Sequence, residues 1–288
     1  MSNPFSTAVT VCLVEQAAQG PFVLHGDVEQ SFQVAKESGF DAVELFLPNA
    51  QCLSSAEVKG LLEKYGLRLA AVGTGAGWLI HQHSLTSGIA EVRRAAIQFI
   101  KSLVDLGGAF GAPAIIGSMQ GRHEPGERVV ALERLSEGLR ELSEYTSQAW
   151  GTRLLYEPLN RYETNLFNRV GDTRMWLESE GLANVQILAD LFHMNIEEVS
   201  LVSALRDNWD RVGHIHWADS NRSAMGMGHT DSASILKLLT ELSYKGYVSA
   251  EVFPLPTGPI AAQKTLKSLS PQPISPEIGY LAGVQSKV

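Results

Sequence analysis

The sequence predicts a single (β/α)₈ barrel, and three observations lead to that fold class. Short apolar runs alternate with longer amphipathic segments along almost the whole chain, a pattern typical of parallel strands joined by crossover helices. The 288 residues suffice for one large barrel. The first apolar run continues into residues 14–20 without the glycine-rich phosphate turn expected of an open doubly wound sheet.

Eight strands and seven helices are predicted from these patterns. The apolar runs that we interpret as strands are 8–13, 42–47, 68–73, 114–118, 153–157, 186–190, 212–216 and 248–253. The amphipathic segments that we interpret as helices are 28–37, 55–65, 89–106, 128–150, 173–178, 199–207 and 232–242. Gly39 and Gly66 follow two of these helices and are expected to be left-handed caps. Because no linker divides the chain, we expect one domain over 1–288, with 268–288 as a C-terminal surface extension.

Composition narrows the possible partners and the compartment. The formal charge is 23 − 31 = −8, and without a basic stripe such a chain would repel nucleic acid. Only two cysteines occur, Cys12 and Cys52, which suits a reducing compartment. Neither a leader-like N-terminus nor an apolar run of roughly 20 residues is present. We therefore expect a cytoplasmic protein that binds neither nucleic acid nor membranes.

Ionisable residues end four adjacent predicted strands in the second half of the chain. They are Glu157, Asp190, the pair His214 and His216, and Glu251. In a (β/α)₈ barrel the carboxyl ends of the strands meet at one rim, where the chemistry occurs. Three carboxylates at the end of apolar strands would be costly to bury without a counter-charge, which a divalent cation supplies. An oxygen-rich set with one imidazole favours Mn²⁺, Mg²⁺ or Co²⁺ over structural zinc. Spacing alone allows either histidine to be the ligand.

A second set of polar residues follows the same strands and could bind hydroxyl groups. It comprises Asn160, Arg161, Glu163, His193, Asn221 and Arg222. Loop solvation and helix capping are equally good explanations for each of them.

Three ordered segments resemble a known family. EPLNRYE (157–163), DLFHMNIEE (190–198) and HIHWADSNR (214–222) resemble the xylose isomerase-like barrel superfamily, and within it the ketose 3-epimerases of the D-tagatose 3-epimerase type. The resemblance implies a metal-dependent sugar isomerase or epimerase that transfers a proton next to a carbonyl, through an enediolate, on a ketose or keto-sugar acid.

The resemblance also implies roles for individual residues. Glu157, Asp190, His216 and Glu251 would hold one divalent ion, with Mn²⁺ preferred, and Glu163, His193 and Arg222 would contact the substrate. Glu157 and Glu251 would also act as the acid/base pair. The segments 73–78 and 117–122 differ from those of the well-known ketohexose epimerases. Since early loops shape the far end of the substrate, its identity stays open.

Several alternatives remain at this stage. A keto-inositol dehydratase or a hydroxypyruvate isomerase would use the same metal chemistry. A DNA endonuclease resembling endonuclease IV would need three zincs and histidines at the ends of strands three and four, which here end in Val72-Gly73 and Gly117-Ser118. A non-catalytic sugar-binding barrel would have no need for both Glu157 and Glu251. A homo-oligomer is compatible with the sequence but is not indicated by any motif.

Overall fold

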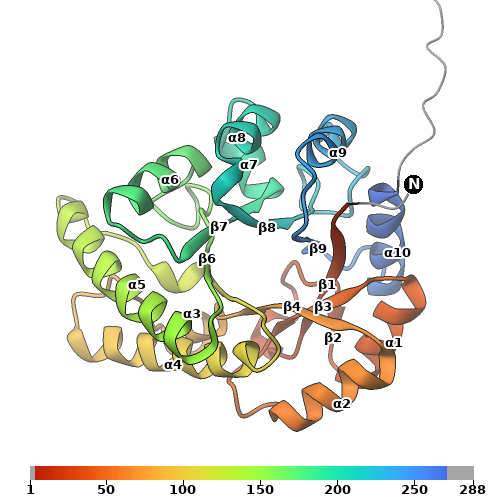
Figure 1. Ribbon diagram of the computed structural model, residues 1–288, viewed down its shortest axis with the longest axis horizontal. Coiled ribbons are helices and arrows are strands. Elements are labelled where there is room, and N and C mark those ends of the chain that lie inside the picture. The colour runs from red at the N-terminus through yellow and green to blue at the C-terminus, as the bar shows by residue number, and fades with distance from the viewer. Residues whose placement is uncertain (1–3, 271–288) are drawn as a thin grey trace, which may run out of the picture.

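The computed structural model describes residues 4–270, and its strands form a closed parallel barrel (Figure 1). Eight strands make the ring, in the order in which they occur along the chain, and β1 pairs with β9 to close it. The ninth, β2 (Leu24–His25), pairs in parallel with the end of β1. The ring strands are β1 (Ser6–Cys12), β3 (Ala42–Phe46), β4 (Arg68–Gly73), β5 (Ala114–Ile116), β6 (Leu154–Tyr156), β7 (Val185–Asp190), β8 (Val212–His216) and β9 (Tyr247–Ala250). The predicted fold class is confirmed.

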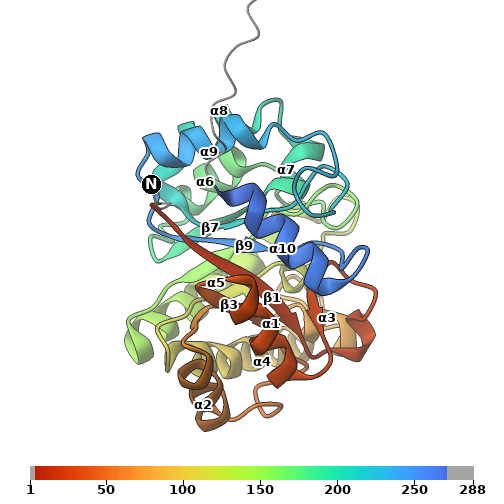
Figure 2. The ribbon, with the colours of Figure 1, turned by 90° about the vertical axis from the view of Figure 1, so that its right-hand side faces the viewer.

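Helices surround the ring, and two short ones lie at the carboxyl ends of the strands. In Figure 2, β1 runs from the N-terminus toward the side on which α3 and α7 lie. The outer helices are α1 (Val28–Ser38), α2 (Ser55–Tyr65), α4 (Ala90–Gly108), α5 (Arg128–Trp150), α6 (Val170–Ser179), α8 (Leu201–Asp207), α9 (Ser232–Glu241) and α10 (Gly258–Leu269). The two additional helices are α3 (Ala76–His81) and α7 (Leu191–Glu197), and the 3₁₀ turns are η1 (Glu15–Ala17), η2 (Ser118–Gln120) and η3 (Trp209–Arg211).

The predicted elements match the observed ones to within a few residues, but three helices were not predicted. Helix α10 begins at Gly258-Pro259, a pair that suggests a helix break, although proline fits the first turn because no hydrogen bond needs its missing N–H. Helices α3 and α7 are too short to show amphipathic periodicity. Gly39 and Gly66 have φ of 99° and 60°, as expected of left-handed caps.

Side chains along each strand point alternately into two layers. One layer is aliphatic and packs under the helices, and a smaller one lies inside the ring. On β3, Val43 and Leu45 pack with the surrounding helices. Ala42 joins Ala8, Ala70 and Tyr247 in a separate cluster, and Glu44, two residues along from Ala42, shares its side of the strand. The barrel interior therefore changes from alanines to polar groups toward the carboxyl ends of the strands.

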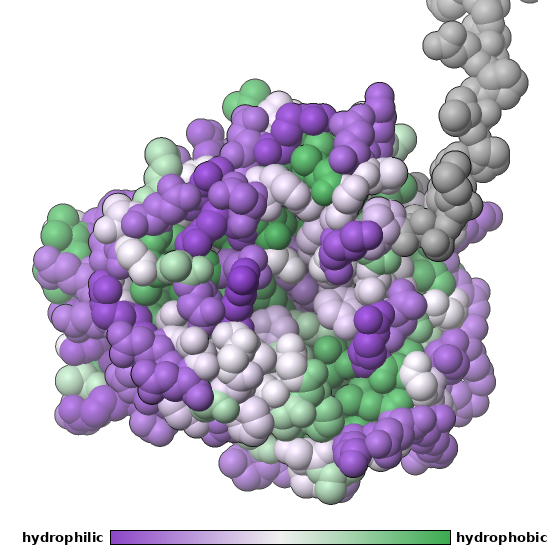
Figure 3. Space-filling model, in the orientation of Figure 1, coloured by the Kyte–Doolittle hydropathy of each residue, from purple (hydrophilic) through white to green (hydrophobic). Residues whose placement is uncertain are grey.

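The proposed C-terminal extension, 268–288, lies mostly outside the described residues. Ser268 and Leu269 complete α10, and the Ser268 hydroxyl accepts a 2.9 Å hydrogen bond from the indole N–H of the fully buried Trp217. Within 4–270, no helix is long and apolar enough to cross a membrane. Hydrophilic residues are spread over most of the face shown in Figure 3, with smaller hydrophobic patches among them.

A test of barrel closure is the substitution Thr10→Val. The buried Thr10 hydroxyl donates to the Ala250 carbonyl across the β1–β9 seam at 2.9 Å and accepts from the Val23 amide at 2.9 Å. Valine leaves the Val23 N–H without this acceptor, so we expect the free energy of unfolding to fall by about 1–3 kcal/mol, measured by chemical denaturation.

The matched control is Thr240→Val on α9, where an exposed hydroxyl donates to Leu236 of the same helix and water can replace the bond. We expect that change to stay within about 0.5 kcal/mol. Equal losses for the two variants would contradict the role given to Thr10.

Candidate metal centre

Four ionisable side chains converge where four neighbouring strands end. Glu157 directly follows β6, Asp190 ends β7, His216 ends β8 and Glu251 directly follows β9. All four are buried, and each offers a ligand atom within 4.8 Å of those of the other three. Parallel neighbouring strands end at the same rim, which is why residues so distant in sequence meet here.

Several atoms of this cluster are positioned to bind a cation. The Nδ1 atom of His216 lies 3.7 Å from Glu157 Oε1, 3.6 Å from Asp190 Oδ2 and 3.5 Å from Glu251 Oε2. His216 Nδ1 and Asp190 Oδ2 are buried and find no hydrogen-bond partner among the described residues. Burial raises the pKa of Glu157 well above its usual range, and the nearby carboxylates add to that effect. A divalent cation would give these atoms a partner and offset the gathered negative charge, so the donor set fits one.

Local structure holds the carboxylates in place. Asp190 caps α7 with one oxygen: its Oδ1 accepts from the Phe192 amide at 2.7 Å. The other oxygen, Oδ2, is then directed toward the cluster. Asp190 is therefore at once a helix cap and a candidate ligand. Glu157 depends on Gly117, since a Cβ atom at that glycine would lie 2.5 Å from Glu157 Oε2.

Glu44 is a buried carboxylate of the site that the sequence analysis missed. It lies in the middle of β3 and accepts from His214 Nε2 at 2.8 Å and from His216 Nε2 at 3.0 Å. Although burial alone would raise the pKa of Glu44, the two histidines hold it well below its usual value. With Nε2 bonded to Glu44, the remaining nitrogen of His216, Nδ1, faces the cluster. This is the arrangement by which a second carboxylate orients a metal-binding imidazole.

The signal for Glu44 was present in the sequence. A glutamate within the apolar strand Ala42–Phe46 is costly to bury alone, so it indicates a partner inside the barrel. The predicted ligands were acids at strand ends, whereas Glu44 lies in the middle of its strand. His214, left open as an alternative ligand, contacts Glu44 and does not belong to the cluster of four.

His193 presents a hydrogen-bond donor to the site. The Asn160 backbone N–H donates to His193 Nδ1 at 3.2 Å, so Nδ1 is the acceptor and the proton of the neutral ring is on Nε2. Burial lowers the pKa of His193, which favours that neutral form. Nε2 is buried without a hydrogen-bond partner in the described chain and lies 3.8 Å from Glu157 Oε1. It is therefore available to donate to an oxygen of a bound molecule.

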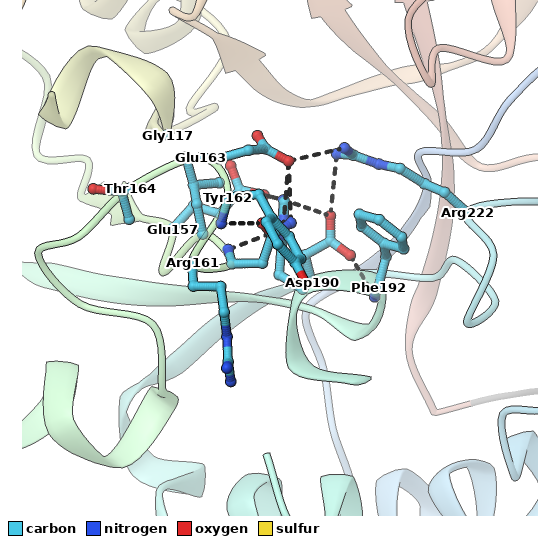
Figure 4. Close-up of polar contacts among 12 residues, drawn as sticks. Gly117, Glu157, Arg161, Tyr162, Glu163, Thr164, Asp190, Phe192 and Arg222 are labelled. Atoms are coloured by element: carbon cyan, nitrogen blue, oxygen red, sulfur yellow. Dashed lines mark hydrogen bonds and ion pairs between the residues drawn. The ribbon is translucent and has the colours of Figure 1, made fainter. Parts of the chain in front are cut away.

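Arg222 reaches the centre from the β8–α9 loop. Its Nη2 donates to Glu251 Oε2 at 2.8 Å, and its guanidinium lies 4.7 Å from the ring centre of Phe192. Figure 4 shows Glu163 and Asp190 directed toward this guanidinium; the shortest N–O distances are 3.6 and 3.7 Å. Arg222 has φ of 59°, an uncommon conformation for a non-glycine residue that the surrounding loop must hold.

Asp219 organises the loop that carries Arg222. Its buried carboxylate accepts from the amides of four loop residues at 2.7–3.0 Å, namely Ser220, Gly226, Gly228 and Thr230. Burial by itself would raise the pKa of Asp219, but these amides lower it to about 2. The amides of Gly226 and Gly228 are therefore bonded to a carboxylate of their own loop.

Two residues of the second polar set have structural partners instead. Arg161 forms a two-pronged ion pair with Glu197 at 2.9 Å and points away from the cluster in Figure 4. Asn221 donates to the Met227 carbonyl within its own loop. Asn160, by contrast, supports His193 and donates to Glu163 Oε1 at 3.1 Å.

A cavity of about 340 Å³ opens over the cluster. Its lining includes the polar side chains Glu163, His193 and Arg222, together with Glu157, His216 and Glu251 of the cluster. It also includes the aromatic residues Phe22, Phe46 and Trp78, of which Phe22 and Phe46 stack at 4.4 Å between ring centres. The site therefore suits a small molecule with both polar and less polar parts.

The role of Glu44 is tested by Glu44→Gln. Glutamine offers one oxygen and one N–H₂ to two histidine nitrogens, so it cannot accept from both, and His216 loses its fixed orientation. We expect the affinity for Mn²⁺, measured by isothermal titration calorimetry, to fall about 10–100-fold while the protein stays folded.

The control is Glu137→Gln, an exposed position on α5 that makes the same chemical change away from the site. Unchanged Mn²⁺ affinity in a folded Glu44→Gln protein would refute the orienting role.

Comparison with known proteins agrees with this geometry. The chain is 33% identical over 238 residues to the 3-dehydro-D-guloside 4-epimerase of Escherichia coli (strain K12), covering 78% of this chain and 87% of that protein. It is 28% identical over 235 residues to the D-psicose 3-epimerase of Enterocloster bolteae, covering 78% and 76%. The crystal structure of the 3-keto-D-glucoside 4-epimerase from E. coli superposes with a TM-score of 0.76 at 26% identity, covering 93% of this chain and 99% of that one.

The relatives are thus named as carbohydrate epimerases, in agreement with the activity expected from the sequence motifs. The family model described as "Xylose isomerase-like TIM barrel" matches residues 32–269, which include all four side chains of the cluster. Fold, cluster and sequence similarity lead to the same conclusion: the chain belongs to the xylose isomerase-like TIM barrel family.

Proposed function

We propose that this protein is a divalent-metal-dependent epimerase that inverts a carbon next to the ketone of a keto sugar. The observation that carries the proposal is the position of Glu157 and Glu251 in one buried cluster with Asp190 and His216, at the floor of a cavity of about 340 Å³. An epimerase needs two groups that can exchange protons with its substrate, and two glutamates can do this. A protein that only binds a sugar needs neither.

The two glutamates would move the proton. One, as the carboxylate, takes the proton from the carbon beside the ketone, and the other, as the acid, gives a proton to the opposite face of that carbon, so the configuration is inverted. A bound divalent cation would attract the ketone and neighbouring hydroxyl oxygens and stabilise the negative charge that develops on them. Of the allowed ions we propose Mn²⁺, since three carboxylates and one imidazole form an oxygen-rich set.

The surrounding residues would bind and orient the sugar. His193 would donate its Nε2 proton to a sugar oxygen. Arg222 holds Glu251 at 2.8 Å and can donate to the same substrate. Glu163, near both of them, would accept from a hydroxyl group. Fixing the sugar in this way reduces the entropy that the reaction must lose.

The names of the relatives support the choice of bond. A 3-dehydro sugar has its ketone at carbon 3, so a 4-epimerase inverts the neighbouring carbon, and psicose is a 2-ketose that is inverted at carbon 3. Both activities act on the carbon next to a ketone. We extend that shared chemistry to this chain, and we favour a 3-keto glycoside over a free ketose because the guloside 4-epimerase has 33% identity against 28%.

Proton exchange in D₂O tests the proposal directly. The Mn²⁺-loaded protein would be incubated with 3-keto glycosides and free ketoses, and the sugars would be examined by proton NMR after removal of the metal. We expect deuterium to replace hydrogen at one carbon next to the ketone, together with a new epimer. Absence of exchange from every sugar, with metal binding confirmed, would refute the epimerase.

The acid/base assignment is tested by Glu251→Gln. The amide cannot take up the proton, so we expect turnover to fall by about 10²–10⁴-fold, measured as the rate of deuterium incorporation at a confirmed metal content. Glu241→Gln, an exposed change near the end of α9, serves as the control and is expected to keep full activity. Retention of more than about a tenth of wild-type turnover by Glu251→Gln would contradict the assignment.

A further inference from the structure

Two further cavities continue outward from the site, and Trp78 lines all three. The middle cavity, of about 250 Å³, is bounded by Trp78, Ser118, Gly121, Arg122, Tyr162 and Glu163. Ser118 and Glu163 also line the central cavity. Arg122 also lines the outer cavity of about 280 Å³, which extends to Gln82 and Arg134. Because each cavity shares lining residues with the next, the three lie side by side in a row from the cluster of four to Arg134, which we call the groove.

The middle part of the groove has the features of a sugar-binding site. Tyr162 is 76% exposed, although its backbone is held by two hydrogen bonds. Its N–H donates to Asn160 Oδ1 at 2.9 Å, and its carbonyl accepts from Arg122 Nη1 at 3.2 Å. The loops after β5 and β6 are therefore joined, and the aromatic residues Trp78 and Tyr162 line the same cavity. Aromatic rings offer rigid apolar faces to the C–H faces of a pyranose, while an arginine donates to its hydroxyl oxygens.

Gly121 is required for this arrangement. Its φ is +85°, and a Cβ atom there would lie 2.0 Å from Ser84 Oγ and 2.3 Å from Thr86 Oγ1. The Thr86 hydroxyl donates to the Arg122 carbonyl at 2.9 Å, and Arg134 donates to the Thr86 carbonyl at 3.4 Å. The turn that delivers Arg122 to the groove is thus tied to the segment that follows α3.

The outer part of the groove suits a neutral hydroxylated group. Arg122 and Arg134 are balanced by Glu124 and Glu127 in its walls, and Gln82, Ser84, Thr86 and Ser87 supply amide and hydroxyl groups. An anion would be repelled by the two glutamates, whereas a polyol can bond to groups of both kinds. A monosaccharide over the cluster of four would leave the middle and outer cavities unused.

We propose that the middle and outer parts of this groove bind the second sugar of a disaccharide-like glycoside whose keto-sugar ring lies over the cluster of four. The inference rests on the proposed epimerase and extends it, by naming the part of the substrate that Trp78, Tyr162 and Arg122 recognise. It also assigns a role to the segments 73–78 and 117–122, which lie in the groove wall.

The test compares two substrates in Tyr162→Ala. The substrates are a 3-keto disaccharide and the methyl glycoside of the same keto sugar, followed by deuterium incorporation. We expect the wild-type protein to prefer the disaccharide in kcat/KM, and the ratio between the two substrates to fall about fivefold in the variant, mainly through KM for the disaccharide. Met175→Ala, an exposed change on α6, is the control and should keep the wild-type ratio.

A binding measurement separates this inference from the proposed function. The unoxidised parent disaccharide, which has no ketone and cannot react, would be studied by saturation-transfer NMR with the Mg²⁺-loaded protein. We expect saturation on both sugars in the wild type and a loss on the second sugar in Tyr162→Ala. Exchange on keto sugars without any disaccharide preference would overturn the groove and leave the epimerase standing. Tyr162-dependent binding of the second sugar without exchange would keep the groove and overturn the epimerase.

Discussion

The rest of the site depends on one constraint, the burial of three carboxylates and an imidazole at the carboxyl end of an apolar barrel. Glu157, Asp190 and Glu251 are each less than a tenth exposed, and they lie near one another instead of beside separate arginines or lysines. Arg222 alone contributes a permanent positive charge within hydrogen-bond distance, to Glu251, in this part of the described chain. Such a group is stable only with a further counter-charge. This constraint explains why His216 Nδ1 and Asp190 Oδ2 have no hydrogen-bond partner in the described chain: both atoms are placed to bind a cation.

The supporting structure is arranged around that constraint. Below the cluster, Glu44 fixes the ring of His216 from inside the barrel, and His214 fixes Glu44. Above it, Asn160 sets the protonation of His193, and Asp219 holds the loop that keeps Arg222 in a left-handed conformation. The Asn160–His193 contact joins the segments that follow β6 and β7, the Glu44 contacts link β3 to β8, and the Asp219 contacts stay within the β8–α9 loop. The barrel thus positions the side chains, and the loops determine the atom that each presents.

Sequence analysis could predict the parts of the molecule that follow from local pattern. The alternation of apolar and amphipathic segments predicted the barrel, and acids at strand ends predicted which side chains meet. Glu44 was missed because its partners, His214 and His216, are about 170 residues away. Arg161 could not be distinguished from Asn160, because only the folded loop shows that Glu197 takes up Arg161. The groove past Trp78 joins three separate segments, and no local pattern indicates it.

Anomalous diffraction from crystals soaked in Mn²⁺ would locate the metal directly. Two groups of side chains in the described chain could hold an ion, and they share His216: the cluster of four, and the trio of Glu44, His214 and His216. We assign the metal to the cluster of four and expect one anomalous peak among Glu157, Asp190, Glu251 and the Nδ1 atom of His216, with Nε2 still bonded to Glu44. A peak between Glu44 and the two Nε2 atoms, or no peak in either place, would contradict this assignment.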